Sequence, residues 1–348
     1  MIGKKIKYYR LKSGLTSEEL ATRVGCTKAA ISLYESDDRE PNAEMIQKLA
    51  DALGISWIML LEQNRETLIF NHSSFRKNSK ALKKDVEILK SEIESRCSNR
   101  FDILNVLGID DEHIFKPEPL SFHDAPSINA DKIRKILGLP PSGPIYSLTN
   151  VLEHIGIIVL SFDCTEEIDG LNGTVNGIPY IFFNSTSRTV ERQRFTLAHE
   201  VCHLFFEFDD SITEKEKEKY INQVAGALLI PTKDIYFLFG KTNRNISIYL
   251  RNDVSKVYRI APSCLVNRLH ETGVVTNAYH KNFFINLNKN GGRKNEQSQL
   301  DSIKDSEVPT IFTQQVYLAL SEELITMSKA AEYLNIPLYD VMQNMRVE

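Results

Sequence analysis

The sequence is poor in cysteine, and no two of its cysteines form a CxxC pair. Its five cysteines are widely spaced and odd in number, which argues against a disulfide framework and is typical of a reducing compartment. No apolar run is long enough to span a bilayer. The basic N-terminal segment lacks the apolar core of a signal peptide. These absences predict a cytoplasmic protein with no membrane partner.

The chain also lacks an excess of positive charge. Its formal net charge is −4 over 348 residues, so any surface for nucleic acid has to be a local patch. With 42% hydrophobic and 25% charged residues, the composition is that of an ordinary globular protein. The length is sufficient for two or three domains, each with its own core.

Helical patterns at both ends of the chain flank strand patterns in its middle. The strand signals are GIIVLSF and PYIFFN, the second following the turn-like VNG, and helical patterns run from Glu191 to about Phe206 and from Thr213 to Ile230. This order predicts an α+β fold rather than an alternating parallel sheet, without an internal repeat. We expect a helical domain (1–64), a helical connector (65–120), a mixed domain (121–288), a flexible polar linker (289–306) and a small unit with a Ser-capped helix (307–348).

The motif HEVCH at 199–203 carries the strongest chemical signal. On a helix, His199 and His203 share one face and can present two imidazoles to one ion. The carboxylate of Glu200 can then reach a water molecule at the ion, remove its proton and so promote attack on a carbonyl. Apolar neighbours (Phe195, Leu197, Leu204, Phe205) predict that this helix is buried. The alternative is a buried helix with two incidental, hydrogen-bonded histidines.

A catalytic zinc site needs a third protein ligand, and the next helix offers acidic candidates. Thr213 and Glu216 form a capping box, which places a helix start near Glu214. Glu218 shares a face with the apolar residues of this helix, so it is the acidic residue best placed to enter a buried site. Glu214, one turn earlier, is the competitor. The alternative for each of these glutamates is a solvated, salt-bridged helix start.

In these motifs the sequence resembles the ImmA/IrrE-type metallopeptidases. The resemblance rests on ERQRFTLAHEVCH (191–203), DGLNGTVNGIPYIFFN (169–184) and EKYINQVAGALLIP (218–231), and it covers about half of the chain. It implies a zincin-like domain with a small mixed sheet, with His199, His203 and Glu218 as metal ligands and Glu200 as general base. The implied metal is Zn²⁺, with Mn²⁺ as the alternative. The strand before the HExxH helix would be the edge to which an extended substrate adds.

Two residues depart from the family pattern, Cys202 where glycine is common and Ile221 where alanine is common. Both are larger than the usual residue, so they bear on the shape of the cleft more than on the ligands. Cys202 could sense oxidation or close a structural zinc site as a fourth ligand. The more ordinary interpretation is a buried small hydrophobe.

The first sixty residues carry a second motif, two short helices joined by a glycine turn. Thr16 caps the first helix with Glu19 three residues later, Gly25 makes the turn, and Thr27 caps the second helix. The exposed face of the second helix suits a major groove, and basic residues upstream could contact phosphates: Lys4, Lys5, Lys7, Arg10 and Lys12. The alternative is a helical bundle that serves only protein contacts.

This segment resembles the XRE (Cro/cI-like) helix-turn-helix family over nearly all of its length. The resemblance includes ISLYE (31–35) and PNAEMIQKLADALGI (41–55), and it implies that Thr27, Lys28, Ala29 and Ser32 face a double-stranded DNA operator. Because acidic and basic residues balance over 1–64, we expect modest affinity and a homodimer.

Two functions follow from these patterns. The first is a DNA-binding regulatory zinc metallopeptidase that cleaves a protein partner such as a transcriptional repressor, with cleavage of its own interdomain chain also conceivable. The second is a transcriptional repressor or antitoxin whose peptidase-like domain is a sensor that hydrolyses little. The presence of Glu200 favours the first, because a site that only binds metal needs no base.

Overall fold

The structure is a computed structural model that describes residues 2–55, 57–61, 68–73, 83–109, 115–185, 189–209, 211–242, 246–292, 296–301 and 304–346. The chain divides into two compact units, Met1–Ile69 with Lys80–Asn99, and Phe70–Ser79 with Arg100–Glu348. Helix α6 (Lys83–Leu107) contributes to both. No helix in the described residues combines the length and apolar character that crossing a bilayer demands. The five-part division expected from the sequence stays a prediction.

The first unit is a bundle of short helices. It contains α1 (Ile2–Lys12), α2 (Ser17–Val24), α3 (Lys28–Glu35), α4 (Ala43–Leu53), α5 (Trp57–Leu61) and the first part of α6. The expected capping box of Thr16 and Glu19 is present, and Gly25 ends α2 with φ 72°, a left-handed conformation that glycine adopts at little cost. Leu20 and Ile31 meet in the core of this bundle. The glycine turn thus sets α3 across α2.

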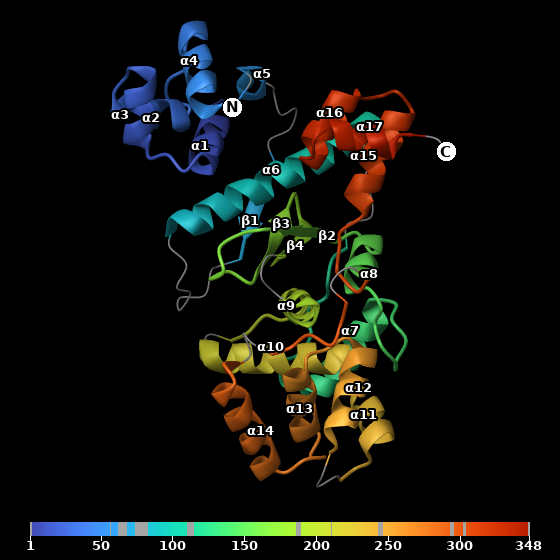
Figure 1. Ribbon diagram of the computed structural model, residues 1–348. Coiled ribbons are helices and arrows are strands. Elements are labelled where there is room, and N and C mark those ends of the chain that lie inside the picture. The colour runs from blue at the N-terminus through green and yellow to red at the C-terminus, as the bar shows by residue number, and fades with distance from the viewer. Residues whose placement is uncertain are drawn as a thin grey trace. The chain divides into compact units, whose positions relative to one another are not determined.

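The second unit is a small mixed sheet surrounded by helices, so the predicted α+β class is confirmed (Figure 1). The strands are β1 (Phe70–His72), β2 (Ile158–Phe162), β3 (Gly170–Val175) and β4 (Ile178–Asn184), in the order β1-β3-β4-β2. β3 and β4 form a hairpin whose turn residues Asn176 and Gly177 have φ 51° and 83°, as the Asn-Gly sequence favours. β4 also pairs in parallel with β2.

Eleven further helices of the second unit lie in the described residues besides α6, and one of them carries the HExxH motif. Their bounds are α7 (Pro126–Ile136), α8 (Leu148–His154), α9 (Val190–His203), α10 (Glu214–Leu229), α11 (Thr232–Phe239), α12 (Ile248–Tyr258), α13 (Pro262–Glu271), α14 (Asn277–Lys289), α15 (Ile311–Ser321), α16 (Met327–Leu334) and α17 (Leu338–Asn344). Helix α9 lies between the sheet and α10 (Figure 1).

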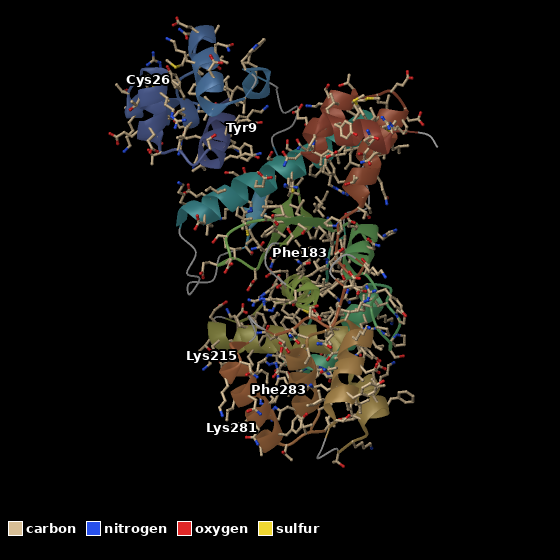
Figure 2. All side chains as sticks on the ribbon, in the orientation of Figure 1. Tyr9, Cys26, Phe183, Lys215, Lys281 and Phe283 are labelled. Atoms are coloured by element: carbon tan, nitrogen blue, oxygen red, sulfur yellow. The ribbon has the colours of Figure 1, made fainter. Side chains whose placement is uncertain are left out.

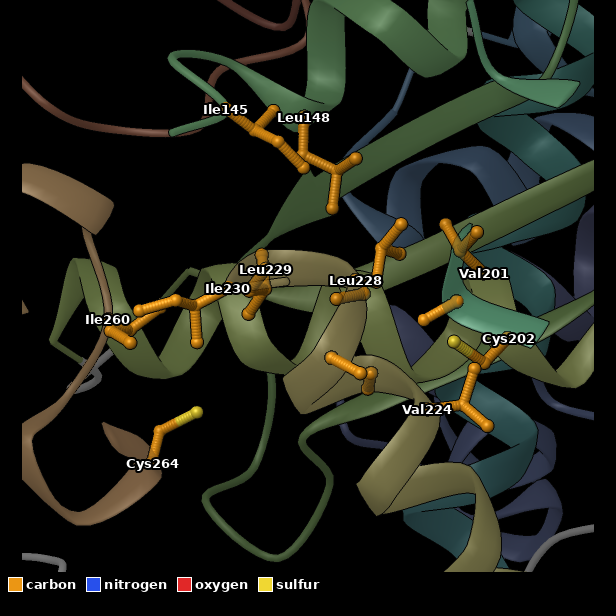
Figure 3. Close-up of a cluster of buried hydrophobic side chains, with 14 of the residues drawn as sticks. Ile145, Leu148, Val201, Cys202, Val224, Leu228, Leu229, Ile230, Ile260 and Cys264 are labelled. Carbon is orange, nitrogen blue, oxygen red and sulfur yellow. The ribbon is translucent and has the colours of Figure 1, made fainter. Parts of the chain in front are cut away.

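The core around α9 joins the sheet to α10. Phe183 of β4, labelled in Figure 2, is fully buried in this cluster together with Leu197 of α9. On the other side of α9, Cys202 and Val201 share the cluster with Val224 and other apolar residues of α10 (Figure 3). The HExxH helix is therefore covered on two sides by apolar side chains, which fixes the direction of its remaining face.

The strand that directly precedes α9 is not a free edge. All seven residues of β4 are buried, and β4 pairs with β3 on one side and with β2 on the other. The expectation that an extended substrate adds to the strand before the HExxH helix is therefore wrong. β4 leads directly into α9 along the chain. The hairpin nevertheless places β3 next to β4 on the side away from β2, so β4 is an inner strand of the sheet.

The polar segment after α14 is held against the second unit at several points. Glu296 accepts hydrogen bonds from Ser263, and Glu191 at the start of α9 accepts from Ser298 and Gln299. Further along, Glu307 is buried and paired with Arg194 of α9. The described part of this segment thus hydrogen-bonds to α9 and α13. The flexibility expected from its polar, glycine-containing sequence stays a prediction.

The C-terminal helices repeat the layout of α2 and α3. Helix α16 has eight residues, as α2 has, and ends at Asn335 with φ 53°, the counterpart of Gly25. Thr326 caps α16, so the cap is a threonine and not the serine that the sequence suggested. The exposed residues of α17 include Tyr339 and Met342. This repeat escaped sequence reasoning because its side chains differ.

Candidate metal centre and nucleic-acid interface

His199, His203 and Glu218 converge on one point in the second unit. A ligand atom from each lies within 4.8 Å of the other two, and they are the one such group of His, Cys, Asp or Glu found in the described residues. The two Nε2 atoms are 3.0 Å apart. One carboxylate oxygen of Glu218 lies 3.5 Å from the Nε2 of His199, and the other lies 3.5 Å from that of His203.

These separations fit a divalent ion. Ligand atoms about 2.1 Å from a tetrahedral ion are about 3.4 Å from one another, and the three separations here are 3.0, 3.5 and 3.5 Å. Two imidazoles and a carboxylate are also a donor set that zinc prefers at catalytic sites, where a fourth position stays open. The residues present therefore suit the metal that the sequence implied, and their role as ligands stays a prediction.

Asn222 orients the first of the two imidazoles. Its Oδ1 lies 3.0 Å from the Nδ1 of His199, and an amide oxygen can only accept a hydrogen bond. The proton of the neutral ring is therefore on Nδ1, and the lone pair of Nε2 points toward His203 and Glu218. Sequence reasoning missed this role, although Asn222 follows Glu218 by one helical turn on the same face of α10.

Glu200 follows His199 on α9, and its carboxylate is held by the sheet. It is 7% exposed, and its Oε2 accepts a hydrogen bond of 2.6 Å from the Nδ2 of Asn172 on β3. The strand approaches closely at Gly170, where an added Cβ would lie 3.0 Å from the Cγ of Glu200. Asn172 was missed because nothing in the sequence of a short strand marks it as a neighbour of the motif.

Two sequence candidates lie outside the cluster. Cys202 is fully buried among apolar residues, and burial raises the pKa of its thiol, so the thiolate needed for metal binding or oxidation is disfavoured. Glu214 is exposed at the first turn of α10. Of the two glutamates that the sequence offered, Glu218 is the one brought to the histidines.

The predicted DNA-facing residues lie together on the first unit. Thr27 caps α3 by accepting from the backbone N–H of Ala30, and Lys28, Ala29 and Ser32 follow on the helix. All four predicted residues (Thr27, Lys28, Ala29, Ser32) are exposed. The structure thus leaves them accessible at one end and one face of α3, and DNA contact stays a prediction.

One of the expected phosphate contacts is wrong. Arg10 is 7% exposed, and its guanidinium donates to both carboxylate oxygens of Glu35 at 2.5 and 2.9 Å and to the carbonyl of Leu15. It ties α1 to α3 inside the bundle instead of facing solvent. A basic residue in a basic segment looked like a phosphate ligand because its partner lies 25 residues away.

Comparison with known proteins gives family matches for two parts of the chain. A model described as "Helix-turn-helix" matches residues 6–60, and one described as "IrrE N-terminal-like domain" matches residues 152–270. The chain belongs to the helix-turn-helix family and also carries an IrrE N-terminal-like domain. Both resemblances inferred from the sequence are confirmed.

Curated relatives match the helix-turn-helix part. The "HTH-type transcriptional regulator SinR" of Bacillus subtilis (strain 168) is 34% identical over 68 residues, 19% of this chain and 61% of that protein. The "Uncharacterized HTH-type transcriptional regulator y4dJ" of Sinorhizobium fredii is 33% identical over 67 residues, 19% of this chain and 87% of that protein. The chain thus spans less than two thirds of SinR.

A solved structure aligns over the full chain but with little likeness. It is the crystal structure of Bacillus thuringiensis PlcR in complex with the peptide PapR7 and DNA, which covers 100% of this chain and 88% of that one at 14% identity. The TM-score is 0.19, so this alignment carries no argument about fold or function.

Proposed function

We propose that this chain is a DNA-binding regulator whose second domain is a metal-dependent peptidase acting on a protein partner, such as a transcriptional repressor. The observation that carries the proposal is the convergence of His199, His203 and Glu218 within 4.8 Å. Glu200 directly follows His199 on α9. The match to the IrrE N-terminal-like domain over residues 152–270 supports it.

The residues divide the work of hydrolysis. His199, His203 and Glu218 would hold a zinc ion, or manganese in its place, and the ion would supply Lewis acidity toward a peptide carbonyl and toward water. Glu200 accepts the proton of the attacking water and later delivers it to the leaving nitrogen. Asn172 restricts the carboxylate of Glu200 to one orientation through its hydrogen bond. Asn222 keeps His199 in the tautomer that exposes the Nε2 lone pair.

The first domain would direct the peptidase to an operator. Thr27, Lys28, Ala29 and Ser32 are exposed at the start and outer face of α3, and a helix so placed can enter a major groove. The curated relatives of this segment are named as transcriptional regulators. Because acidic and basic residues balance here, binding as a homodimer to paired half-sites would supply the missing affinity.

The test compares metal binding and hydrolysis in matched variants. Purified parent protein should hold one zinc per chain and cleave a repressor encoded beside it. Glu200→Gln should keep the zinc but lose cleavage, while Glu218→Gln should lose both. Glu214→Gln is the control, since it alters an exposed glutamate on the same helix and should resemble the parent.

The alternative, a sensor with little hydrolysis, makes a different prediction for the same proteins. In that case the parent holds zinc and binds its operator, but no condition yields cleavage, and Glu200→Gln behaves as the parent does. A parent protein without bound metal would contradict both functions of the second domain.

A further inference from the structure

Strand β1 joins the sheet of the second unit from a stretch of chain that is flanked by the first. Met1–Ile69 and Lys80–Asn99 belong to the first unit, whereas Phe70–Ser79 belong to the second. β1 lies beside β3 (Figure 1). The two strands pair antiparallel, with His72 opposite Gly173 and Phe70 opposite Val175. The chain therefore places part of its own interdomain segment on the outer side of β3.

β3 is the strand that borders the candidate catalytic carboxylate. Asn172 donates from its side chain to Glu200, and its backbone carbonyl accepts a hydrogen bond of 3.0 Å from the N–H of Ser73. An extended peptide reaching the metal site by β-addition would use these same backbone groups of β3. The segment 70–73 thus engages the edge beside Glu200 as a bound strand would.

The segment is also recognised through a side chain. The Nδ1 of His72 lies 2.5 Å from the hydroxyl oxygen of Tyr180 on β4, although β3 lies between these two strands. Gly173 makes this contact possible. A Cβ there would lie 2.5 Å from the hydroxyl oxygen of Tyr180 and 2.5 Å from the carbonyl oxygen of Asn71. A larger residue would separate the tyrosine from the histidine.

We propose that residues 70–73 are an internal competitor of the peptidase, held on the outer edge of β3 by backbone pairing and by the contact between His72 and Tyr180. A protein substrate has to displace them before it is cleaved. The inference rests on the proposed function, because it assumes that substrate adds to β3. The strand has three residues and its middle residue, Asn71, is exposed, and a short, partly exposed strand can open locally.

The same geometry describes the substrate. It is an extended segment of a protein, antiparallel to β3, with a hydrogen-bonding side chain opposite Gly173 that reaches the hydroxyl of Tyr180. An imidazole fulfils this requirement, since that is the group that occupies the position in the chain itself.

Proline in β1 tests the competitor directly. Hydrogen-bonded positions alternate in an antiparallel pair, so Asn71 shares the phase of Ser73, whose N–H donates to β3. Asn71→Pro removes the backbone N–H of residue 71 and should release the segment. Asn71→Ala keeps this N–H and is the matched control. Both variants are made with Glu200→Gln, so that added peptide is not cut, and both are checked for cooperative thermal unfolding.

The probe is a fluorescein-labelled synthetic peptide of residues 67–75, followed by fluorescence anisotropy. A tethered strand competes at a high effective concentration, so the proline variant should bind the peptide at least about tenfold more tightly than the alanine variant. His72→Ala in the protein is the second releasing variant and should also raise binding. Equal binding by the proline, alanine and His72→Ala proteins would overturn the proposal.

Hydrolysis is scored separately in proteins that retain Glu200. If residues 70–73 compete with substrate, Asn71→Pro should cleave faster than Asn71→Ala, and the free peptide should inhibit it. Equal cleavage rates of these two variants would overturn the proposal that residues 70–73 compete with substrate. If the proline variant gains peptide binding but no protein cleaves substrate, the proposed hydrolysis is refuted. The proposal that residues 70–73 occupy a peptide-binding edge of β3 would survive that result.

Discussion

Replacement of Asn222 by leucine tests how the metal centre is oriented. The amide oxygen of Asn222 is 3.0 Å from the Nδ1 of His199, the nitrogen that does not face the cluster. Leucine is similar in size but accepts no hydrogen bond. In Asn222→Leu the ring of His199 loses the partner that selects its tautomer, and the form with the proton on Nε2 cannot bind a metal.

How far the metal affinity falls in Asn222→Leu depends on whether water can reach the Nδ1 of His199. Removing an outer partner of a metal-bound histidine lowers metal affinity about 10- to 100-fold. His199 is 4% exposed, but Asn222 itself is exposed, so water can replace part of the lost interaction. We therefore expect the lower end of the range, about tenfold, which corresponds to about 1.4 kcal/mol of binding free energy.

The assay is competition for zinc against a chromophoric chelator at fixed pH. Asn222→Asp is the matched control, because its carboxylate also accepts from Nδ1–H and should keep at least the affinity of the parent. A leucine variant that binds zinc as tightly as the parent would refute the orienting role. So would an aspartate variant that loses as much affinity as the leucine variant.

Three further outcomes follow from buried polar groups. Arg194→Met leaves the buried carboxylate of Glu307 without its ion-pair partner, and should lower the free energy of unfolding by about 3–5 kcal/mol in urea titrations. Burial opposes the charged form of Glu92, but the hydrogen bond from Tyr8 and a nearby arginine outweigh it and lower the pKa. The charged Glu92 therefore stabilises the fold at pH values above its pKa in the unfolded chain. This stabilisation is lost as the pH falls through its lower pKa in the folded protein. The destabilisation by Glu92→Gln should accordingly begin to shrink near the ordinary glutamate pKa of about 4.3 and disappear at lower pH in thermal unfolding. Cys202 is fully buried, and burial raises the pKa of its thiol, so a thiol reagent should label it only after unfolding. Labelling of Cys202 itself in the native protein, read by mass spectrometry of its peptide, would contradict this burial.

Much of the site was predictable because its determinants are local. Residues four apart share a helix face, so the spacing of His199 and His203 implies their convergence once α9 forms. The capping box at Thr213 fixed the start of α10, and with it the inward direction of Glu218. The helix-turn-helix layout followed from the same kind of signal at Thr16 and Gly25.

What the sequence did not reveal depends on contacts between distant residues. β1 has three residues, too few for an alternating pattern, and its pairing depends on the absence of a side chain at Gly173 about a hundred positions later. Arg10 looked like a phosphate ligand because the sequence cannot show that Glu35 neutralises it. Glu307 lies one residue after the predicted linker, and its ion-pair partner Arg194 is more than a hundred residues away in the sequence.

The contacts of Glu307 tie the chain after the polar segment to α8 and α9. Its carboxylate accepts hydrogen bonds from the backbone N–H groups of Leu148 and Thr149 at the start of α8, at 3.1 and 2.9 Å, and pairs with Arg194. A buried carboxylate is stable when charged and neutral donors both satisfy it. Arg194 precedes the HExxH motif by little more than one turn of α9. Through this ion pair the chain near Glu307 helps to orient α9, the helix that carries HExxH. The motif alone does not reveal this contact.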